Sequence, residues 1–261
     1  MQLALSTSAQ VEHYLQRSKS IVIPLGSTEQ HGPIGLIGTD TVCAQTIAAQ
    51  LGKHSGVLVA PALSLTVAQF NRGFAGTLTV RASTMLALIL DVLHSLADQG
   101  FQRIYLLNGH GANIAVARAA CQDFYLERGR MTGAVPRCRL RSWWEYPEVD
   151  RLRRAWYGSL EGLHATPSEV AIVMAAEPEH SARARLEGAA LAADAPAPLG
   201  AEFLRDHGGD NHFDAASHRA AFPDGRVGSH SILATREHGE ALIAAAVADA
   251  ARDLAAFETE H

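Results

Sequence analysis

The chain has 261 residues, of which 48% are hydrophobic and 19% charged, as in an ordinary globular protein. Its formal net charge is −5 and it has no run of Lys or Arg, so we expect no nucleic-acid partner. No apolar run reaches the roughly 18 residues of a membrane span, and the first residues lack the pattern of a signal peptide. Three cysteines (Cys43, Cys121, Cys138) lie far apart without a CxxC pair. These features predict a reducing compartment, the cytoplasm.

Short apolar segments alternate with helix-like segments along the chain. We expect strands at 20–26, 56–63, 103–111 and 134–144, and helices at 41–53, 83–100, 112–129, from 166 onward and at 235–257. Continuous apolar strands between helices are typical of a sheet covered on both faces. The prediction is an α/β fold: one domain over 1–261, three-layer α/β/α, with a mostly parallel sheet. Segments 192–200 and 206–218 read as loops inserted within that domain.

Two polar clusters follow strands of this predicted sheet. One is "STEQHGPIGLIGTD" (27–40), after the first strand; the other is "NGHG" (108–111), after the third. Sites in open α/β sheets form outside the carboxyl ends of the strands. The two clusters are therefore expected at one edge of the sheet.

Each cluster has a functional and a plainer interpretation. Glu29 and His31 stand two residues apart, so in extended backbone both side chains point the same way. A carboxylate beside an imidazole suits zinc or manganese, although a polar loop is the alternative. Asp40 precedes a predicted helix, where it is a favoured N-cap. His110 is flanked by glycines, which permit a tight turn and close backbone approach.

A third polar segment is "HATPSE" (164–169). Thr166 and Glu169 have the spacing of a capping box, with Pro167 at the first helical position. Glu169 therefore either closes a helix N-terminus or projects towards the other polar groups. His164 precedes the box and is a candidate acid or base.

Other catalytic classes have little support. The chain contains no GxSxG, GxGxxG or Walker motif, and Cys43 lies in a helical apolar pattern typical of a core. The aromatic segments 143–146 and 156–157 are read as pocket walls or as packing. Five later histidines either line a pocket mouth, contact a neighbouring subunit or are solvated: His207, His212, His218, His230 and His238.

Four segments carry a family resemblance. "PLGSTEQHGPIGLIGTDT", "GFAGTLTV", "LLNGHGAN" and "HATPSE" occur in the order and spacing of the creatininase family of metal-dependent amidohydrolases. The similarity runs from Ile21 to the helix after Glu169. A weaker match, "FPDGRVGS…ATREHG", extends it over nearly the whole chain.

The resemblance implies a centre of two divalent ions, zinc or manganese, with iron(II) also compatible. Glu29, His31, Asp40 and His110 match the family's ligands, and Asp40 is placed to bridge the two ions. Creatininase has a further ligand Glu two residues after the His of NGH, where this chain has Ala112. Glu169 is the natural substitute. His164 matches a family His near the metals and is a candidate for proton transfer.

The implied activity is hydrolysis of a C–N bond in a cyclic or linear amide by a metal-activated water. The alternatives are a mycofactocin-type peptidase, a formamidopyrimidine-nucleotide deformylase, or a catalytically inactive metal-binding oligomer. Where many family members have an E-H pair, this chain has Phe70 and Asn71. The expected partners are a small-molecule amide substrate and copies of the chain in a homo-oligomer, a hexamer by resemblance.

Overall fold

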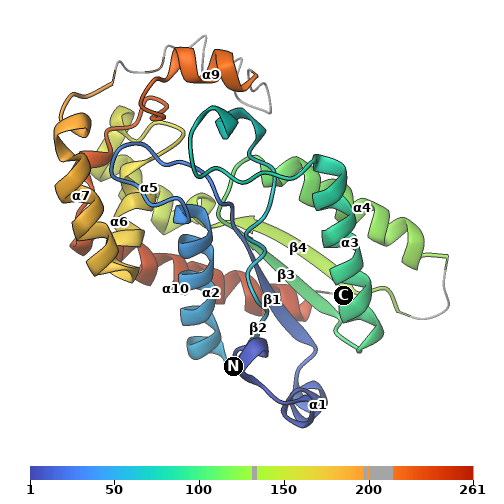
Figure 1. Cartoon of the computed structure of the whole chain (residues 1–261). Helices are drawn as coiled ribbons and strands as arrows, with labels where there is room; N and C mark the ends of the chain where they lie inside the picture. The colour runs from blue at the N-terminus through green and yellow to red at the C-terminus, as the bar shows by residue number, and fades with distance from the viewer. Residues whose placement is uncertain (131–133, 197–198, 200–213, 261) are drawn as a thin grey trace.

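The computed structural model describes residues 1–130, 134–196, 199 and 214–260. Its centre is a sheet of four strands in the order β2-β1-β3-β4 (Figure 1). The strands are β1 (Ser20–Leu25), β2 (Leu58–Val59), β3 (Arg103–Asn108) and β4 (Arg137–Ser142). All three neighbouring pairs are parallel. The predicted parallel sheet is therefore confirmed, with β2 shorter than expected.

The two central strands are buried on both faces. In β1, Val22 points to one core while Ile21 and Ile23 point to the other, and β3 divides Tyr105 and Ile104 in the same way. Side chains alternate between the faces of a strand, so an uninterrupted apolar run is stable only where helices cover both faces.

Helices cover both faces of the sheet (Figure 1). One core contains residues of α1, α3 and α4, and the other contains residues of α2, α5, α6 and α10. This arrangement confirms the expected three layers. The α-helices are α1 (Ser8–Arg17), α2 (Thr39–Ser55), α3 (Ala82–Asp98), α4 (Asn113–Arg128), α5 (Pro147–Tyr157), α6 (Pro167–Ala176), α7 (Pro178–Ala192), α9 (Ala215–Ala221) and α10 (Arg236–Thr259).

Four of these helices differ from the sequence-based prediction. Helices α1, α5 and α7 were not expected, although α5 and α7 begin at Pro147 and Pro178, a residue favoured at the first helical position. Helix α9 begins inside the segment predicted as a loop, at Ala215, where Asp214 caps its N-terminus. The rest of that predicted loop, 206–213, lies outside the described residues. Residues 197–198 and 200 of the other predicted loop, 192–200, also lie outside them.

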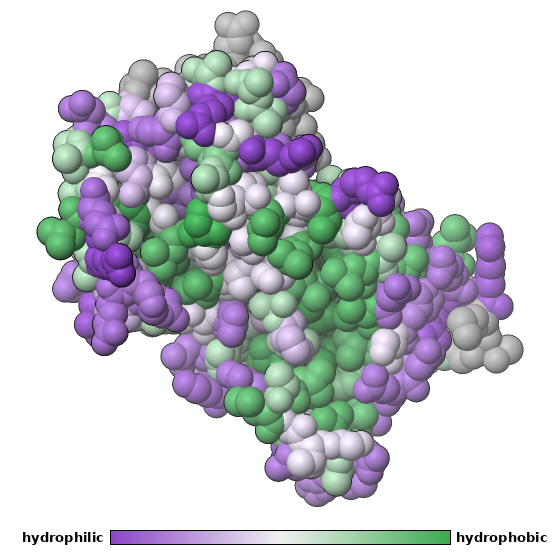
Figure 2. Space-filling view, viewed as in Figure 1, coloured by the Kyte–Doolittle hydropathy of each residue, from purple (hydrophilic) through white to green (hydrophobic). Residues whose placement is uncertain are grey.

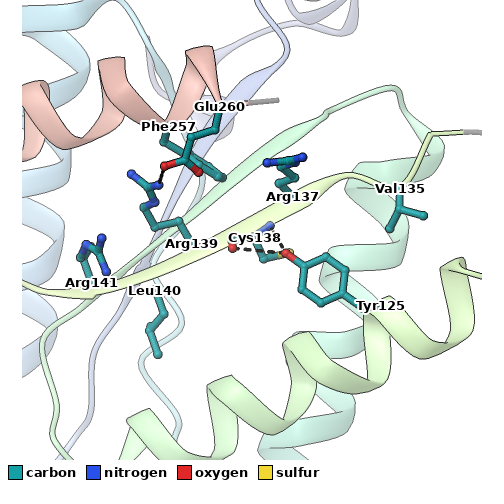
Figure 3. A pocket seen from close by; sticks show the side chains of 9 residues that line it. All are labelled: Tyr125, Val135, Arg137, Cys138, Arg139, Leu140, Arg141, Phe257 and Glu260. Carbon is teal, nitrogen blue, oxygen red and sulfur yellow. Dashed lines mark hydrogen bonds and ion pairs between the residues drawn. The ribbon is translucent and has the colours of Figure 1, made fainter.

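Strand β4 forms one edge of the sheet and lines a cavity of about 650 Å³ (Figure 3). Arg139 and Arg141 reach from it to Asp253 of α10. The Tyr125 hydroxyl accepts the N–H of Cys138 at 2.7 Å. Polar contacts around this cavity therefore connect α4, β4 and α10. Its lining runs along β4 from Arg137 to Arg141, whereas the candidate site lies beyond the last residues of the strands.

Apolar side chains also gather on the surface between α2 and α3, beside the β2 edge (Figure 2). Within the described part of the chain, no helix combines the length and apolarity that crossing a membrane requires.

Candidate metal centre

Six ionisable side chains meet at the carboxyl edge of the sheet. The loop after β1 supplies Glu29 and His31, and the turn after β3 supplies His110. The remaining three come from the first turn of α2 (Asp40), the residue two before the Thr166 cap (His164) and the first turn of α6 (Glu169). Glu29 has no exposed surface and the least buried carboxylate, Glu169, is 9% exposed. The structure thus brings together all six candidate ligand and proton-transfer residues of the sequence analysis.

Backbone carbonyl groups fix the three imidazole rings. Nε2 of His110 lies 2.8 Å from the Val67 oxygen, Nδ1 of His31 lies 3.0 Å from the Glu29 oxygen, and Nε2 of His164 lies 2.7 Å from the Gln30 oxygen. A carbonyl oxygen can only accept, so each of these nitrogens carries the hydrogen. In a neutral ring the other nitrogen then carries a lone pair, as in histidine ligands of metals.

Those other nitrogens face carboxylates, and Asp40 is shared between two of them. Its Oδ1 lies 3.2 Å from Nε2 of His31, and its Oδ2 lies 3.1 Å from Nδ1 of His110. His31 is completed by Glu169 Oε1 at 3.9 Å, and His110 by Glu29 Oε1 at 3.1 Å. One carboxylate therefore lies between two separate clusters of a histidine and an acid.

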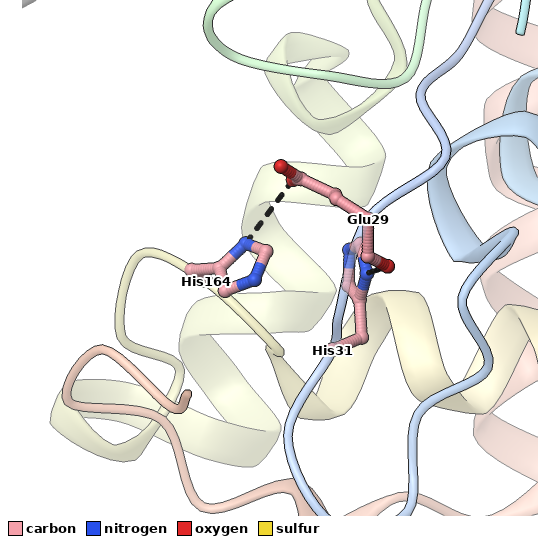
Figure 4. Close-up of side chains that lie close together, drawn as sticks. All are labelled: Glu29, His31 and His164. Atoms are coloured by element: carbon pink, nitrogen blue, oxygen red, sulfur yellow. Dashed lines mark hydrogen bonds and ion pairs between the residues drawn. The ribbon is translucent and has the colours of Figure 1, made fainter. Parts of the chain in front are cut away.

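The third histidine, His164, lies close to a member of each cluster. Nδ1 of His164 is 3.6 Å from Glu29 Oε1, and its ring centroid is 4.5 Å from that of His31. Figure 4 shows the Glu29 carboxylate turned towards the His164 ring, with the His31 ring alongside. His164 and His110 therefore both approach Oε1 of Glu29.

The donor set fits divalent cations. Three groups of three residues have ligand atoms within 4.8 Å of one another: Glu29, Asp40 and His110; His31, Asp40 and Glu169; and Glu29, His31 and His164. Atoms that share a cation at about 2.1 Å lie up to about 4.2 Å apart.

Two of these oxygens also lack any other partner. Glu29 Oε1 and Asp40 Oδ2 are buried without a hydrogen bond, since the nearby His110 Nδ1 does not meet them with hydrogen-bond geometry. Buried, unpaired carboxylate oxygens facing a nitrogen lone pair are unfavourable unless a cation or a proton lies between them. Carboxylate and imidazole donors suit zinc, manganese and iron(II).

The pKa values in the metal-free protein reflect this crowding. Burial alone would lower the pKa of His31, but Asp40 and Glu169 outweigh it and raise the pKa to about 10. Burial would also lower the pKa of His110, but Glu29 and Asp40 outweigh it and raise the pKa. Burial raises the pKa of Glu169 to about 7 although His31 opposes it. Burial and the neighbouring His31 lower the pKa of His164 to about 4.

The plainer interpretation of Asp40 is wrong. The N-cap of α2 is Gly38, and no side-chain capping bond is present. Asp40 is one residue inside the helix, so its carboxylate turns towards the histidines. The capping box of α6 is confirmed: Thr166 accepts the N–H of Glu169 at 3.2 Å, and Glu169 Oε1 accepts the N–H of Thr166 at 2.5 Å. Glu169 caps its helix and also faces His31.

The glycines around His110 have different roles. A Cβ on Gly109 would lie 2.3 Å from the backbone oxygen of Asp40, whereas a Cβ on Gly111 would meet nothing within 4 Å. Gly109 therefore lets the turn after β3 pack against the start of α2. Asn108 holds the same turn by accepting the N–H of His110 at 3.2 Å and donating to its carbonyl oxygen at 2.8 Å.

Sequence reasoning missed two residues that hold Glu29. Asn71 is fully buried, and its Nδ2 donates to Glu29 Oε2 at 2.9 Å. Gln30 donates to Asn71 Oδ1 at 2.8 Å and to the Gly225 oxygen at 3.0 Å. These contacts join segments 41 and 195 residues apart, so no local pattern reveals them. The signal was the position of Asn71 where many family members have E-H.

The later histidines and the aromatic segments pack in the fold. His218 is buried against Phe70, at 5.2 Å between ring centroids, and His238 stacks on Trp156 at 4.1 Å. The solvated reading is therefore wrong for His218, because α9 turns it inward. His230 is partly exposed, while His207 and His212 lie outside the described residues. Trp143 belongs to the core, so packing accounts for it.

Comparison with known families decides the affiliation. The profile of the family described as creatinine amidohydrolase, or creatininase, matches residues 4–254. The chain belongs to the creatininase family.

Relatives of this family resemble the chain in sequence or in fold. The mycofactocin precursor peptide peptidase of Mycobacterium ulcerans is 33% identical over 141 residues, covering 51% of this chain and 54% of that protein. The chain thus spans about half the length of the curated relatives it matches. A crystal structure of creatinine amidohydrolase matches 100% of this chain and 98% of its own, with a TM-score of 0.82 and 19% identity. A mutant creatininase of Zn–Zn type has a TM-score of 0.80 at 19% identity, covering 99% of this chain and 98% of its own. These likenesses establish the fold.

Proposed function

We propose that this protein is a metal-dependent amidohydrolase that binds two divalent cations and hydrolyses a C–N bond in a cyclic or linear amide. The observation that carries the proposal is the position of Asp40, whose two oxygens face different histidines at 3.2 and 3.1 Å. Glu29 and His110 would hold one cation, and His31 and Glu169 the other, with Asp40 between them. Zinc or manganese is the expected metal, and iron(II) is compatible with the same donors.

Two bound cations would supply a water of lowered pKa and would polarise the amide carbonyl group. The residues of the chain orient and move protons around this centre. His164 keeps its hydrogen on Nε2 through the Gln30 carbonyl, which leaves Nδ1 free to accept a proton. We propose that Nδ1 takes a proton from the attacking water and returns it to the departing nitrogen. Glu169, which lies beside His31, is the second group placed to transfer a proton.

Similarity favours a peptide as one candidate substrate. The relative that is 33% identical over half of this chain is named a peptidase acting on a precursor peptide. A peptide bond and a lactam present the same reacting group, so the centre itself does not separate them. A catalytically inactive metal-binding oligomer, such as the hexamer expected by resemblance, is the rival outside enzymes.

An activity screen separates these candidates. Protein loaded with zinc or manganese is incubated with small lactams, formamides and short peptides, and amine release is measured. We expect turnover of at least one class, abolished by a chelator and restored by metal. His164→Ala should retain both metals and lose most turnover. A fully loaded protein that releases no amine from any class would contradict the proposal and support the inactive oligomer.

A further inference from the structure

A second cavity, of about 650 Å³, has a described lining that contains no residue of the candidate centre. The short 3-10 helix η2 (Gln69–Gly73) and α9 line it, through Arg72, Gly73, Ala215, Ala216, Arg219 and Ala220. Among the described residues that line it, the charged ones are two arginines and the others are glycine and alanine. The cavity therefore has a basic character and room for a small group.

The same two elements also form a wall of the candidate centre. Arg72 directly follows Asn71, which donates to Glu29 at 2.9 Å. Arg219 directly follows His218, whose ring lies 5.2 Å from Phe70, and the Phe70 ring stacks 6.3 Å from His110. Each arginine is the next residue after one of these buried side chains. The Cα atoms of consecutive residues are about 3.8 Å apart. The cavity thus lies within the length of a short peptide from the candidate centre.

The guanidinium groups in this cavity have no acidic partner in the described part of the chain. Both arginines are exposed, and among the described residues neither Arg72 nor Arg219 makes an ion pair, in contrast to the exposed arginines of α5, α7 and α10 but like Arg17, Arg81, Arg118 and Arg130. The nearest acid on α9, Asp214, accepts the N–H groups of Ala216 and Ser217 as the helix cap. Two exposed arginines without acidic partners are therefore available to an anion.

Arg219 is also held in position. It donates to the Gly73 oxygen, and its guanidinium carbon lies 4.7 Å from the centre of the Phe74 ring. A guanidinium group fixed by one hydrogen bond and by stacking retains other N–H donors, in the fork geometry that matches a carboxylate. Fixing it beforehand reduces the entropy lost on binding.

We propose that Arg72 and Arg219 bind a carboxylate of the substrate while its amide lies at the candidate centre. This inference rests on the proposed function and specifies its substrate class: amides that bear a free carboxylate, such as N-acyl amino acids or peptides with a free C-terminus. Neither arginine touches the reacting amide. They determine specificity through the far end of the substrate.

The test uses paired probes with the metal-loaded protein. N-acetylated short peptides are compared as free acids and as C-terminal carboxamides, which differ only in the charge of the far end. We expect kcat/KM for the acid to exceed that for the amide by about tenfold or more, the usual size of a charged hydrogen bond. Arg72→Gln and Arg219→Gln should each reduce this preference, mainly through KM, with metal content unchanged. Arg183→Gln, an exposed arginine of α7 outside the cavity, is the matched control and should keep the preference.

Equal turnover of acids and carboxamides by the wild-type protein would overturn the inference, as would an equal loss for both probes in Arg72→Gln. Failure of the proposed function gives a different result: no probe is turned over by protein containing both metals. In that case calorimetric titration with the same acids and carboxamides decides. Binding of the acid alone, weakened about tenfold in Arg72→Gln, supports the carboxylate site. Equal binding, or none, refutes it.

Discussion

Glu169 faces His31 with the same oxygen that closes its own helix. Its Oε1 accepts the N–H of Thr166 at 2.5 Å and lies 3.9 Å from Nε2 of His31. Creatininase has a carboxylate two residues after the His of its NGH motif, and this chain has Ala112 there. We propose that Glu169, at the start of α6, provides that carboxylate instead.

Replacing Glu169 with Gln separates its two roles. The Gln side-chain oxygen still accepts the Thr166 N–H, but a neutral amide is a poor ligand. We expect Glu169→Gln to fold normally and to lose one of two metals, measured by elemental analysis and circular dichroism. Thr166→Ala is the matched control: it removes the cap at a cost of about 1 kcal/mol and keeps both metals. Full metal occupancy in Glu169→Gln would refute the ligand role.

The turn that carries His110 depends on one of its two glycines. In Gly109→Ala the added Cβ would lie 2.3 Å from the backbone carbonyl oxygen of Asp40, while in Gly111→Ala it would meet nothing within 4 Å. We expect Gly109→Ala to lose stability by about 2 kcal/mol or more and to bind metal weakly, because α2 and the turn must separate. Gly111→Ala should change stability and metal binding little. Chemical denaturation and metal titration compare the pair, and equal behaviour of the two variants would contradict the assigned packing.

Asn71 orients Glu29 from outside the ligand set. Asn71→Leu keeps the size of the side chain but leaves Glu29 Oε2 and the Gln30 amide without this partner. Loss of such supporting contacts typically weakens metal binding by about 10- to 100-fold. We expect that loss in Asn71→Leu by competition with a chromophoric chelator. Arg72→Ala, the next residue, should leave metal affinity unchanged, and a similar loss there would argue against a specific role for Asn71.

Metal uptake should compete with protons. In the metal-free protein the pKa of His31, raised to about 10, keeps its ring protonated at neutral pH, and the carboxylates of Glu29 and Asp40 raise the pKa of His110 as well. The stabilisation from His31 is then complete below its ordinary pKa of 6.5 and is lost as the pH rises through about 10.

A cation must displace these protons. We therefore expect apparent metal affinity to fall on acidification, by about tenfold per pH unit for each proton displaced. Calorimetric titrations at pH values on either side of neutrality, in buffers of different ionisation enthalpy, measure both the affinity and the proton release. An affinity independent of pH would contradict the ligand assignment of the two histidines.

Local pattern predicted the parts of this molecule that depend on local sequence. β1 and β3 contain uninterrupted apolar runs, which predicted buried strands. The Thr166–Glu169 spacing predicted a capping box, which the structure confirms. The convergence of Glu29, Asp40 and His110 followed from the rule that parallel strands end at one edge.

Other features depend on contacts distant in sequence. The ring of His110 is fixed by the Val67 carbonyl oxygen, 43 residues away, and a backbone group carries no sequence signal. The capping interpretation of Asp40 is wrong because α2 begins two residues earlier than its polarity pattern indicated, with Gly38 as its N-cap. His218 was expected in a loop, but Asp214 starts a helix that turns it towards Phe70.

The most direct test of a two-cation centre is the metal content of the folded protein at neutral pH. After reconstitution with zinc or manganese and removal of excess metal, mass spectrometry of the elements should find close to two ions per chain. Asp40→Ala, which removes the shared carboxylate without removing a capping bond, should bind less than one and remain folded. Wild-type protein with no bound metal, or Asp40→Ala with two ions per chain, would contradict the account.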